Sequence, residues 1–166
     1  MKLGGGWVVP YPEPGSAAAT RMGKANRRAG SKPEEGLRRE LHRLGLRFRK
    51  DHLIRAGSIR THADVAFTRV RLAVFVDGCF WHQCPEHFHM PKTNLGYWVP
   101  KLTANVERDL RIDEALGDDL WALLRLWEHV GCHEAAIEVV GALAALGHPR
   151  ARAIVDGSAV GVTRGT

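Results

Sequence analysis

An apolar run, Leu72–Val76 (LAVFV), constrains the fold more than any other feature of this sequence. Arg71 and Asp77 flank it, and a short apolar run bounded by charges is typical of a β-strand buried on both faces. Ala63–Phe67 precedes it and reads as a second, shorter strand. A short turn at Thr68–Val70 would join the two, so the sequence predicts a β-hairpin.

Helical signals surround these strands. Ser31–Glu34 (SKPE) is a capping box with proline in the first turn, and Leu37, Leu41 and Leu44 then form one helical stripe that ends at Gly45. The other expected elements are an extended piece at 46–48, a polar loop at 50–62, a helix from Tyr97 or Pro100 to Leu116, a buried strand at 120–127 and a last helix at 134–146, ended by Gly147 and Pro149. This order predicts a mixed α/β fold.

Composition limits the class of protein. The chain has 166 residues, of which 45% are hydrophobic and 25% charged, which suits one globular domain and excludes a wholly disordered chain. Three cysteines are too few, and odd in number, for a disulfide scaffold. No apolar run approaches the ~20 residues of a membrane span, and the first residues lack the apolar core of a signal peptide. We therefore expect a soluble cytoplasmic protein.

Positive charge is concentrated in the first half of the chain. The formal net charge is +6, but residues 21–71 hold 15 Lys/Arg against 5 Asp/Glu, an excess of +10. Such an excess favours a polyanionic partner such as nucleic acid, because each cation that neutralises a phosphate releases a counterion. A solvated basic face without a partner is the alternative. Residues 1–20, rich in Gly, Pro and Ala, are expected to form a flexible arm.

The segment between the hairpin and the next helix has metal-ligand spacing. Cys79, Cys84 and His87 form the pattern Cys-x4-Cys-x2-His, which in a reducing compartment indicates zinc. His129 is the expected fourth ligand, because the strand before it would end at the same sheet edge as Val76 if the two strands lie side by side. The competitors for the fourth position are His89, Cys132 and His133.

Three acidic residues are candidates for a Mg²⁺ site. Asp64 lies within an apolar strand, where a carboxylate is costly unless it is paired or binds metal. Asp77 closes the neighbouring strand and Glu34 lies in the first turn of the first helix. A turn role for Asp77 and a capping role for Glu34 are the structural alternatives.

The segment also carries a histidine and two large aromatic residues. His82 could bind zinc, but its spacing would crowd the metal, and a free imidazole beside a phosphate is a good general base. Phe80 and Trp81 could be buried between the metal loop and the sheet, or exposed as a wedge that stacks between bases. The spacing leaves both readings open.

Together these residues resemble a known family. The matching strings are FVDGCFWH (75–82), CPEH (84–87), PKTN (91–94), NVERD (105–109) and WEH (127–129), preceded by Lys32-Pro33-Glu34 in the first helix. In this order, over about residues 20–131, the chain is similar to the very short patch repair (Vsr-type) endonucleases. GCFWH with these flanks is the specific part of the resemblance.

The resemblance implies a fold and an activity. It implies a PD-(D/E)XK-like (restriction-endonuclease-like) mixed sheet flanked by helices, with a structural zinc loop. The nuclease domain would span 21–132, and 133–166 would be a C-terminal helix and tail. The activity would be Mg²⁺-dependent nicking of double-stranded DNA at T:G mismatches left by deamination of 5-methylcytosine. A nucleoid-associated monomer, linked to a DNA cytosine methyltransferase and a repair polymerase, would fit this activity.

The same resemblance implies residue roles. Asp64 would bind Mg²⁺ together with the backbone carbonyl of Val76, His82 would be the general base, and Glu34 would lie beside them. Phe80 and Trp81 would wedge into the duplex, and Met22 would stack from the opposite groove. Structural zinc would be held by Cys79, Cys84, His87 and His129.

The chain also departs from the family pattern. Asp77 stands where some members have a histidine, and His129 where they have a cysteine. Two rival functions stay open: a restriction-system nuclease without mismatch preference, and a non-catalytic, zinc-stabilised DNA-binding module.

Overall fold

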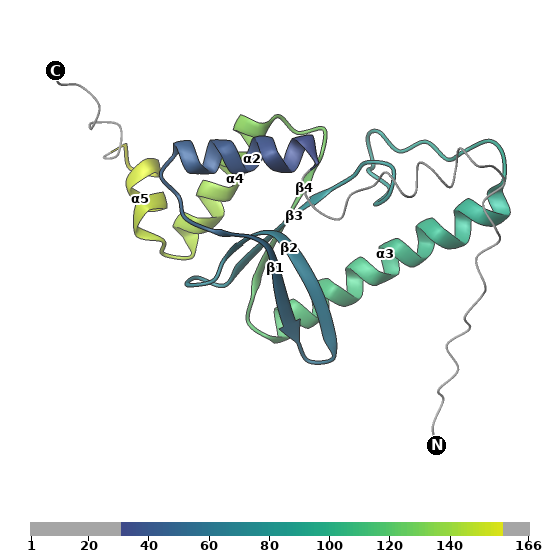
Figure 1. The fold of residues 1–166 in the computed structure, drawn as a ribbon, viewed down its shortest axis with the longest axis horizontal. Helices are drawn as coiled ribbons and strands as arrows, with labels where there is room; N and C mark the ends of the chain where they lie inside the picture. The colour runs from purple at the N-terminus through teal and green to yellow at the C-terminus, as the bar shows by residue number, and fades with distance from the viewer. Residues whose placement is uncertain (1–30, 158–166) are drawn as a thin grey trace.

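The computed structural model describes residues 31–157 as four strands and four helices. In chain order they are α2 (Lys32–Arg43), β1 (Arg49–Ala56), β2 (Ile59–Phe67), β3 (Leu72–Asp77), α3 (Leu95–Asp118), β4 (Ala122–Trp127), α4 (Cys132–Ala145) and α5 (Pro149–Val155), as labelled in Figure 1. The arrangement confirms the predicted mixed α/β fold. The predicted N-terminal arm at 1–20 and Met22 lie outside the described residues.

The four strands form one sheet in the order β1-β2-β3-β4. β1 pairs with β2 and β2 with β3 in antiparallel fashion, which confirms the hairpin predicted from the two apolar runs. β3 and β4 are parallel, with Val76 opposite Leu126 and Asp77 opposite Trp127. The carboxyl ends of these two strands therefore meet at one edge of the sheet, as the assignment of His129 required.

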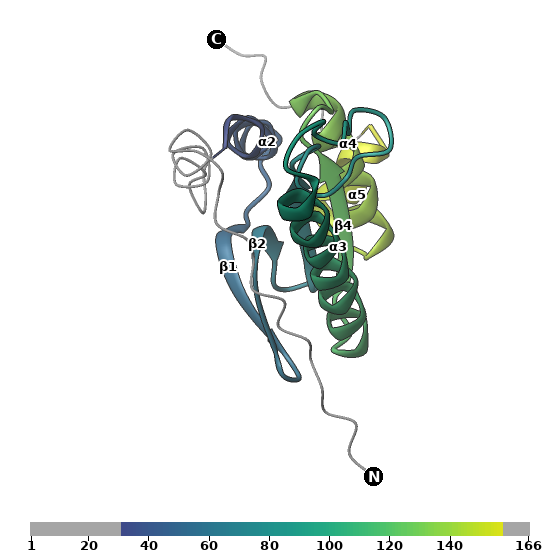
Figure 2. The same cartoon turned by 90° about the vertical axis from the view of Figure 1, so that its right-hand side faces the viewer.

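Helices cover both faces of the sheet (Figures 1 and 2). On one face, Leu72 and Val74 of β3 are buried in a cluster that also holds Leu37 and Leu41 of α2 and residues of α4 and α5. On the other face, Ala73 and Phe75 belong to a cluster with Ile112 and Leu116 of α3. β3 is thus buried on both faces, as its uniform apolar sequence predicts.

The predicted Ser31 cap begins α2, while the carboxylate of Glu34 pairs with Arg38. Ser31 is extended, and its hydroxyl accepts a hydrogen bond from the backbone N–H of Glu34 at 3.4 Å. The helix ends at Arg43, and Gly45 follows in the left-handed region with φ +75°, where glycine is favoured.

The predicted polar loop at 50–62 is wrong: most of it is β-structure. β1 spans Arg49–Ala56, a turn at Gly57 has φ +55°, and β2 begins at Ile59 rather than at Ala63. The hairpin has one buried and one exposed side, so its sequence is half polar. Alternation of charged and apolar residues on either side of Gly57-Ser58 was the signal for a hairpin.

Three boundaries also differ from the sequence prediction. α3 begins at Leu95 and contains Pro100, and β4 begins at Ala122 because Leu120 has a positive φ of +58°. Pro149 does not merely end the preceding helix: it is in the first turn of α5, where His148 caps the helix by accepting from the N–H of Ala151. Among the described helices, none is long and apolar enough to cross a membrane.

Candidate active site and cysteine–histidine cluster

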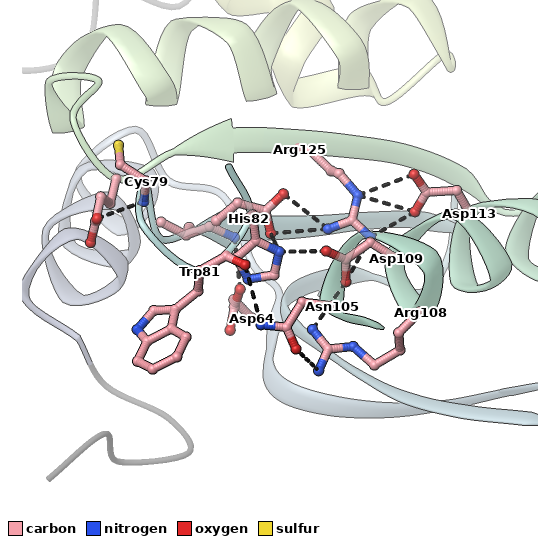
Figure 3. A network of polar contacts seen from close by, with 12 residues as sticks. Asp64, Cys79, Trp81, His82, Asn105, Arg108, Asp109, Asp113 and Arg125 are labelled. Atoms are coloured by element: carbon pink, nitrogen blue, oxygen red, sulfur yellow. Dashed lines mark hydrogen bonds and ion pairs between the residues drawn. The ribbon is translucent and has the colours of Figure 1, made fainter. Parts of the chain in front are cut away.

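Asp64 lies where β2 diverges from β3. The two strands pair only at Val65–Phe67 and Leu72–Val74, so Asp64 is the first residue of β2 beyond the paired segment. Its Oδ2 accepts a hydrogen bond of 2.7 Å from the backbone N–H of Val76, which continues β3 (Figure 3). We call this point, formed by Asp64 and Val76, the fork.

The surroundings of Asp64 disfavour its negative charge. Burial raises the pKa of its carboxyl to about 6, the Val76 N–H opposes that rise, and the nearby charges of Glu34 and Asp77 add to it. Glu34 is buried in the first turn of α2 and pairs with Arg38 at 3.2 Å. A partly buried carboxylate with acidic neighbours is an environment that a hard divalent cation would stabilise, so Asp64 fits the metal-binding role implied for it.

His82 lies against a residue that the sequence pattern left unassigned. Its Nδ1 is 2.5 Å from Oδ2 of Asp109, which α3 supplies from the other side of the site (Figure 3). Burial alone would raise the pKa of Asp109, but the hydrogen bond and charge of His82, with help from Arg108 and Arg125, lower it below its usual value. Asp109 lies in the NVERD string, which marked this part of the helix as similar to the family. The sequence alone does not show that the carboxylate of Asp109 pairs with His82.

Arg125 organises the carboxylates around this pair. Its Nη1 donates to both oxygens of Asp77 at 2.9 Å, and its Nε and Nη2 donate to Asp113 at 2.7 to 3.2 Å. Burial opposes the charge of Arg125, yet the hydrogen bonds to Asp113 and Asp77 raise its pKa above the ordinary value. Asp77 is therefore a buried ion-pair partner as well as a strand end. The single charge within LWALLRLW was the signal for Arg125.

The aromatic residues of the loop form a half-buried cluster with α3. The rings of Phe80 and Trp81 meet edge to face at 5.1 Å, and Phe80 contacts Trp98 of α3 at 5.2 Å. Lys101 lies over the ring of Trp81, and Asn105 donates to the carbonyl of Trp81 at 3.2 Å. These partners orient Phe80 and Trp81 without fully burying them.

Four predicted metal ligands come together beyond the strand ends. One ligand atom each from Cys79, Cys84, His87 and His129 lies within 4.8 Å of all the others. The Cys79 Sγ–His129 Nδ1 distance is 3.1 Å and the Cys84 Sγ–His129 Nδ1 distance is 3.7 Å. The Cys84 Sγ–His87 Nδ1 distance is 3.9 Å. Tetrahedral zinc with sulfur and nitrogen ligands has separations of about 3.3–3.8 Å, and the distances here lie on either side of that range, so the set could hold a small tetrahedral metal after small side-chain movements.

The competitors for the fourth position lie elsewhere. Cys132 begins α4 and its Sγ faces the carbonyl of Pro33 at 4.0 Å, while His133 approaches Glu40 at 3.6 Å. His89 is exposed and is not part of the cluster.

The two thiols of the cluster differ in acidity. Burial, together with the neighbouring Cys84, raises the pKa of Cys79 to about 11. Burial would also raise the pKa of Cys84, but hydrogen bonds from the backbone of Glu86 and the side chain of His87 lower it. Glu128 completes the surroundings by accepting from the N–H of Cys79 at 2.6 Å. A bound cation would remove the conflict between the two sulfurs by favouring both thiolates.

Comparison with known proteins shows which family of proteins this chain matches. The family model for the DNA mismatch endonuclease Vsr matches residues 16–87. Type II nicking enzyme V.NaeI of Lentzea aerocolonigenes is 48% identical over 139 residues, which cover 83% of this chain and 84% of that protein. The chain belongs to the Vsr family of DNA endonucleases. Type II nicking enzyme V.NmeDIP of Neisseria meningitidis serogroup C (36% identity; 64% of this chain, 70% of the relative) and DNA mismatch endonuclease Vsr of Escherichia coli strain K12 (34%; 51% and 52%) are further relatives.

In this Vsr-family endonuclease, two separate parts of the chain supply the residues of the site. The family model covers Asp64, His82 and three of the cluster residues, which lie on β2 and the loop after β3. The remaining pieces, Asp109 on α3 and His129 after β4, come from later in the chain. The fold brings both halves to one edge of the sheet.

Proposed function

We propose that this enzyme nicks one strand of duplex DNA at a T:G mismatch by Mg²⁺-dependent phosphodiester hydrolysis. The observation that carries the proposal is the His82–Asp109 pair, with a 2.5 Å contact, on the same edge of the sheet as the partly buried Asp64. A general base and a cation-binding carboxylate are what hydrolysis of a phosphodiester requires. We also propose that the fold is of the restriction-endonuclease-like type.

In the proposed mechanism, the chain's own groups hold the metal and move the proton. Asp64 and the backbone carbonyl of Val76 would hold Mg²⁺, and bound Mg²⁺ would stabilise negative charge on the phosphate and the leaving oxygen. Asp109 engages Nδ1 of His82, which leaves Nε2 to accept the proton of the attacking water. Glu34 would assist at the fork, where its charge already acts on Asp64.

Recognition of the mismatch would depend on the aromatic residues. Phe80 and Trp81 are half-buried: Phe80 packs against Trp98, and Asn105 donates to the backbone carbonyl of Trp81, so the two residues are positioned at the loop surface. A mispaired step unstacks at lower cost than a matched one, so a fixed aromatic wedge discriminates between them. Met22 would stack from the opposite groove.

The cysteine–histidine cluster would bind structural zinc. Cys79, Cys84, His87 and His129 satisfy the ligand number and the spacing of a closed zinc site. His129 Nε2 also faces Glu86 at 3.7 Å, a contact of the kind that fixes the orientation of a metal-binding imidazole. The metal would hold the loop that carries Phe80, Trp81 and His82.

One experiment separates this proposal from its closest rival. Relatives named Type II nicking enzymes favour a second candidate, a restriction-system nuclease without mismatch preference. Nicking of a T:G duplex and of its matched T:A and C:G counterparts, with Mg²⁺, in varied sequence contexts, decides between the two. We expect cleavage of the T:G duplex alone; equal cleavage of all three would support the rival. No Mg²⁺-dependent cleavage of any duplex would indicate a non-catalytic DNA-binding module.

The wider setting follows from the same proposal. T:G mismatches of this origin arise where a DNA cytosine methyltransferase acts, and a nick needs a polymerase to complete repair, so functional links to both would follow. The enzyme would act as a monomer through a nuclease domain at 21–132.

A further inference from the structure

The β1–β2 hairpin carries two arginines directly opposite each other. Arg55 of β1 pairs in register with Arg60 of β2, next to the turn, and both side chains are exposed. Like charges at directly opposed positions destabilise an antiparallel pair. The hairpin projects away from α2, α4 and α5 (Figures 1 and 2), so packing against those helices does not account for the pair.

Neither arginine has a carboxylate within ion-pair distance in the described part of the chain. Neither arginine makes an ion pair or a side-chain hydrogen bond with any residue in 31–157. The acid nearest in register on the same strand, Asp51, pairs instead with His62 at 3.0 Å. The unbalanced pair therefore points to an anion from outside the protein.

Arg60 lies four residues before Asp64 on the same strand, β2. From Ile59 to Ala63 burial alternates along the strand: residues 59, 61 and 63 face inward, and Arg60 and His62 outward. The alternation ends at Asp64, whose carboxylate turns toward the backbone N–H of Val76 on β3. The inward side contacts α3, where Ile54, Ala56 and Ala63 share a cluster with Ile112 and Leu116. Four residues of antiparallel strand separate Arg60 from Asp64, which is about 13 Å.

We propose that Arg55 and Arg60 form a phosphate clamp. The clamp binds the DNA backbone at some distance from the nicked bond, on the side of the hairpin. This inference rests on the proposed function, because it takes Asp64 as the point of cleavage. With a rise of 3.4 Å per nucleotide, about 13 Å along the duplex axis corresponds to about four nucleotides. Two guanidinium groups side by side offer the planar donors that bind phosphate oxygens bidentately.

The test compares the salt dependence of binding in three variants. Affinity for a T:G duplex is measured without divalent cation, so that binding is independent of cleavage. Loss of two phosphate contacts in R55A/R60A should reduce the slope of log K against log salt by about 1.8, equivalent to about 60-fold at 0.1 M salt if the proteins bind equally at 1 M. R55K/R60K should keep most of the slope. Arg152→Ala, which removes an exposed arginine on α5 away from the hairpin, should leave it unchanged.

A second measurement identifies the phosphates. Neutral methylphosphonates are placed about four nucleotides from the nicked bond, on each side in turn. At the clamped position they should weaken wild-type binding and have no further effect on R55A/R60A. Additive effects at every position would overturn the clamp, as would an unchanged slope in R55A/R60A, which would leave an acidic protein surface as the partner.

Thermal unfolding and cleavage distinguish loss of the clamp from damage to the hairpin. R55A/R60A should unfold at the same or a higher temperature than wild type, because a repulsive pair is removed. A lower unfolding temperature would overturn the inference, because weaker binding would then follow from a damaged hairpin. If the wild type binds duplex but nicks none, the proposed function fails while the binding test of the clamp still stands.

Discussion

The imidazole of His82 is fixed by Asp109, whose Oδ2 lies 2.5 Å from Nδ1 of the ring. The two residues come from different elements, the loop after β3 and the middle of α3, so the pair exists only in the folded chain. Asp109 is held in turn by Arg108 at 3.1 Å and lies 3.9 Å from Arg125. The orientation of the proposed base is therefore set by a carboxylate that is itself restrained on two sides.

Asp109→Asn should slow nicking by about 10²–10⁴-fold, because the amide no longer fixes the tautomer that leaves Nε2 free to accept a proton. The measurement is single-turnover nicking of a T:G duplex at saturating enzyme and Mg²⁺. Asp113→Asn is the matched control, since Asp113 is on the same helix but bonds Arg125 instead of His82. Equal losses in the two variants would assign the effect to the arginine network rather than to His82.

The raised pKa of Asp64 predicts that the protein loses stability as pH rises. Bound Mg²⁺ should restore that stability. The pKa of the Asp64 carboxyl is raised from 3.8 to about 6, chiefly by burial. The folded protein therefore binds this proton more tightly than the unfolded chain, and stability falls by roughly 1–3 kcal/mol as pH rises from about 4 to above 6. Asp64→Asn removes this loss, so at pH 7 without divalent cation it should unfold at a higher temperature than wild type, and at pH 4 the difference should disappear.

Mg²⁺ provides the other half of the Asp64 experiment. It should raise the unfolding temperature of wild type at pH 7 and leave Asp64→Asn unchanged, while Asp64→Ala should bind a T:G duplex but not nick it. An equal effect of Mg²⁺ on wild type and Asp64→Asn would place the cation elsewhere.

Local patterns predicted much of this molecule because their physical causes are local. The capping box at Ser31 specifies the start of α2, and the apolar run at Leu72 specifies a strand buried on both faces. The Cys-x4-Cys-x2-His spacing, together with the expectation that two strand ends meet, was enough to predict that His129 joins the cluster.

Prediction from sequence failed where a residue's role depends on a distant partner. Asp109 and Arg125 are ordinary helix and strand residues until α3 and β4 bring them beside His82 and Asp77. The hairpin was mistaken for a loop because its outer side meets solvent, so half of its residues are polar. The burial pattern of a sequence indicates which face of a single helix or strand is buried. It does not indicate which side chains on different elements become partners, because that depends on the fold.

His129→Ala should abolish binding of the proposed zinc and destabilise the loop that carries His82. The variant should lose about one equivalent of zinc, because a structural site with three ligands no longer excludes water from the metal. Metal content by atomic emission and thermal unfolding are the two measurements. Cys132→Ala is the control, since its sulfur lies outside the cluster. Retention of zinc by His129→Ala, with loss in Cys132→Ala, would contradict the assignment.

Gly36 and Cys132 hold α2 and α4 in close contact, and substitutions there test that packing. A methyl group at Gly36 would clash with Sγ of Cys132, although Gly→Ala within a helix is otherwise favourable by about 1 kcal/mol. Gly36→Ala should therefore destabilise the protein, by about 1–3 kcal/mol, as overpacking does. Cys132→Ala removes the sulfur and leaves only the Cβ of residue 132, 3.3 Å from the new methyl, so the double variant should recover most of the loss. Urea unfolding of the four proteins gives the coupling energy, and additive effects would show that the two helices move apart instead.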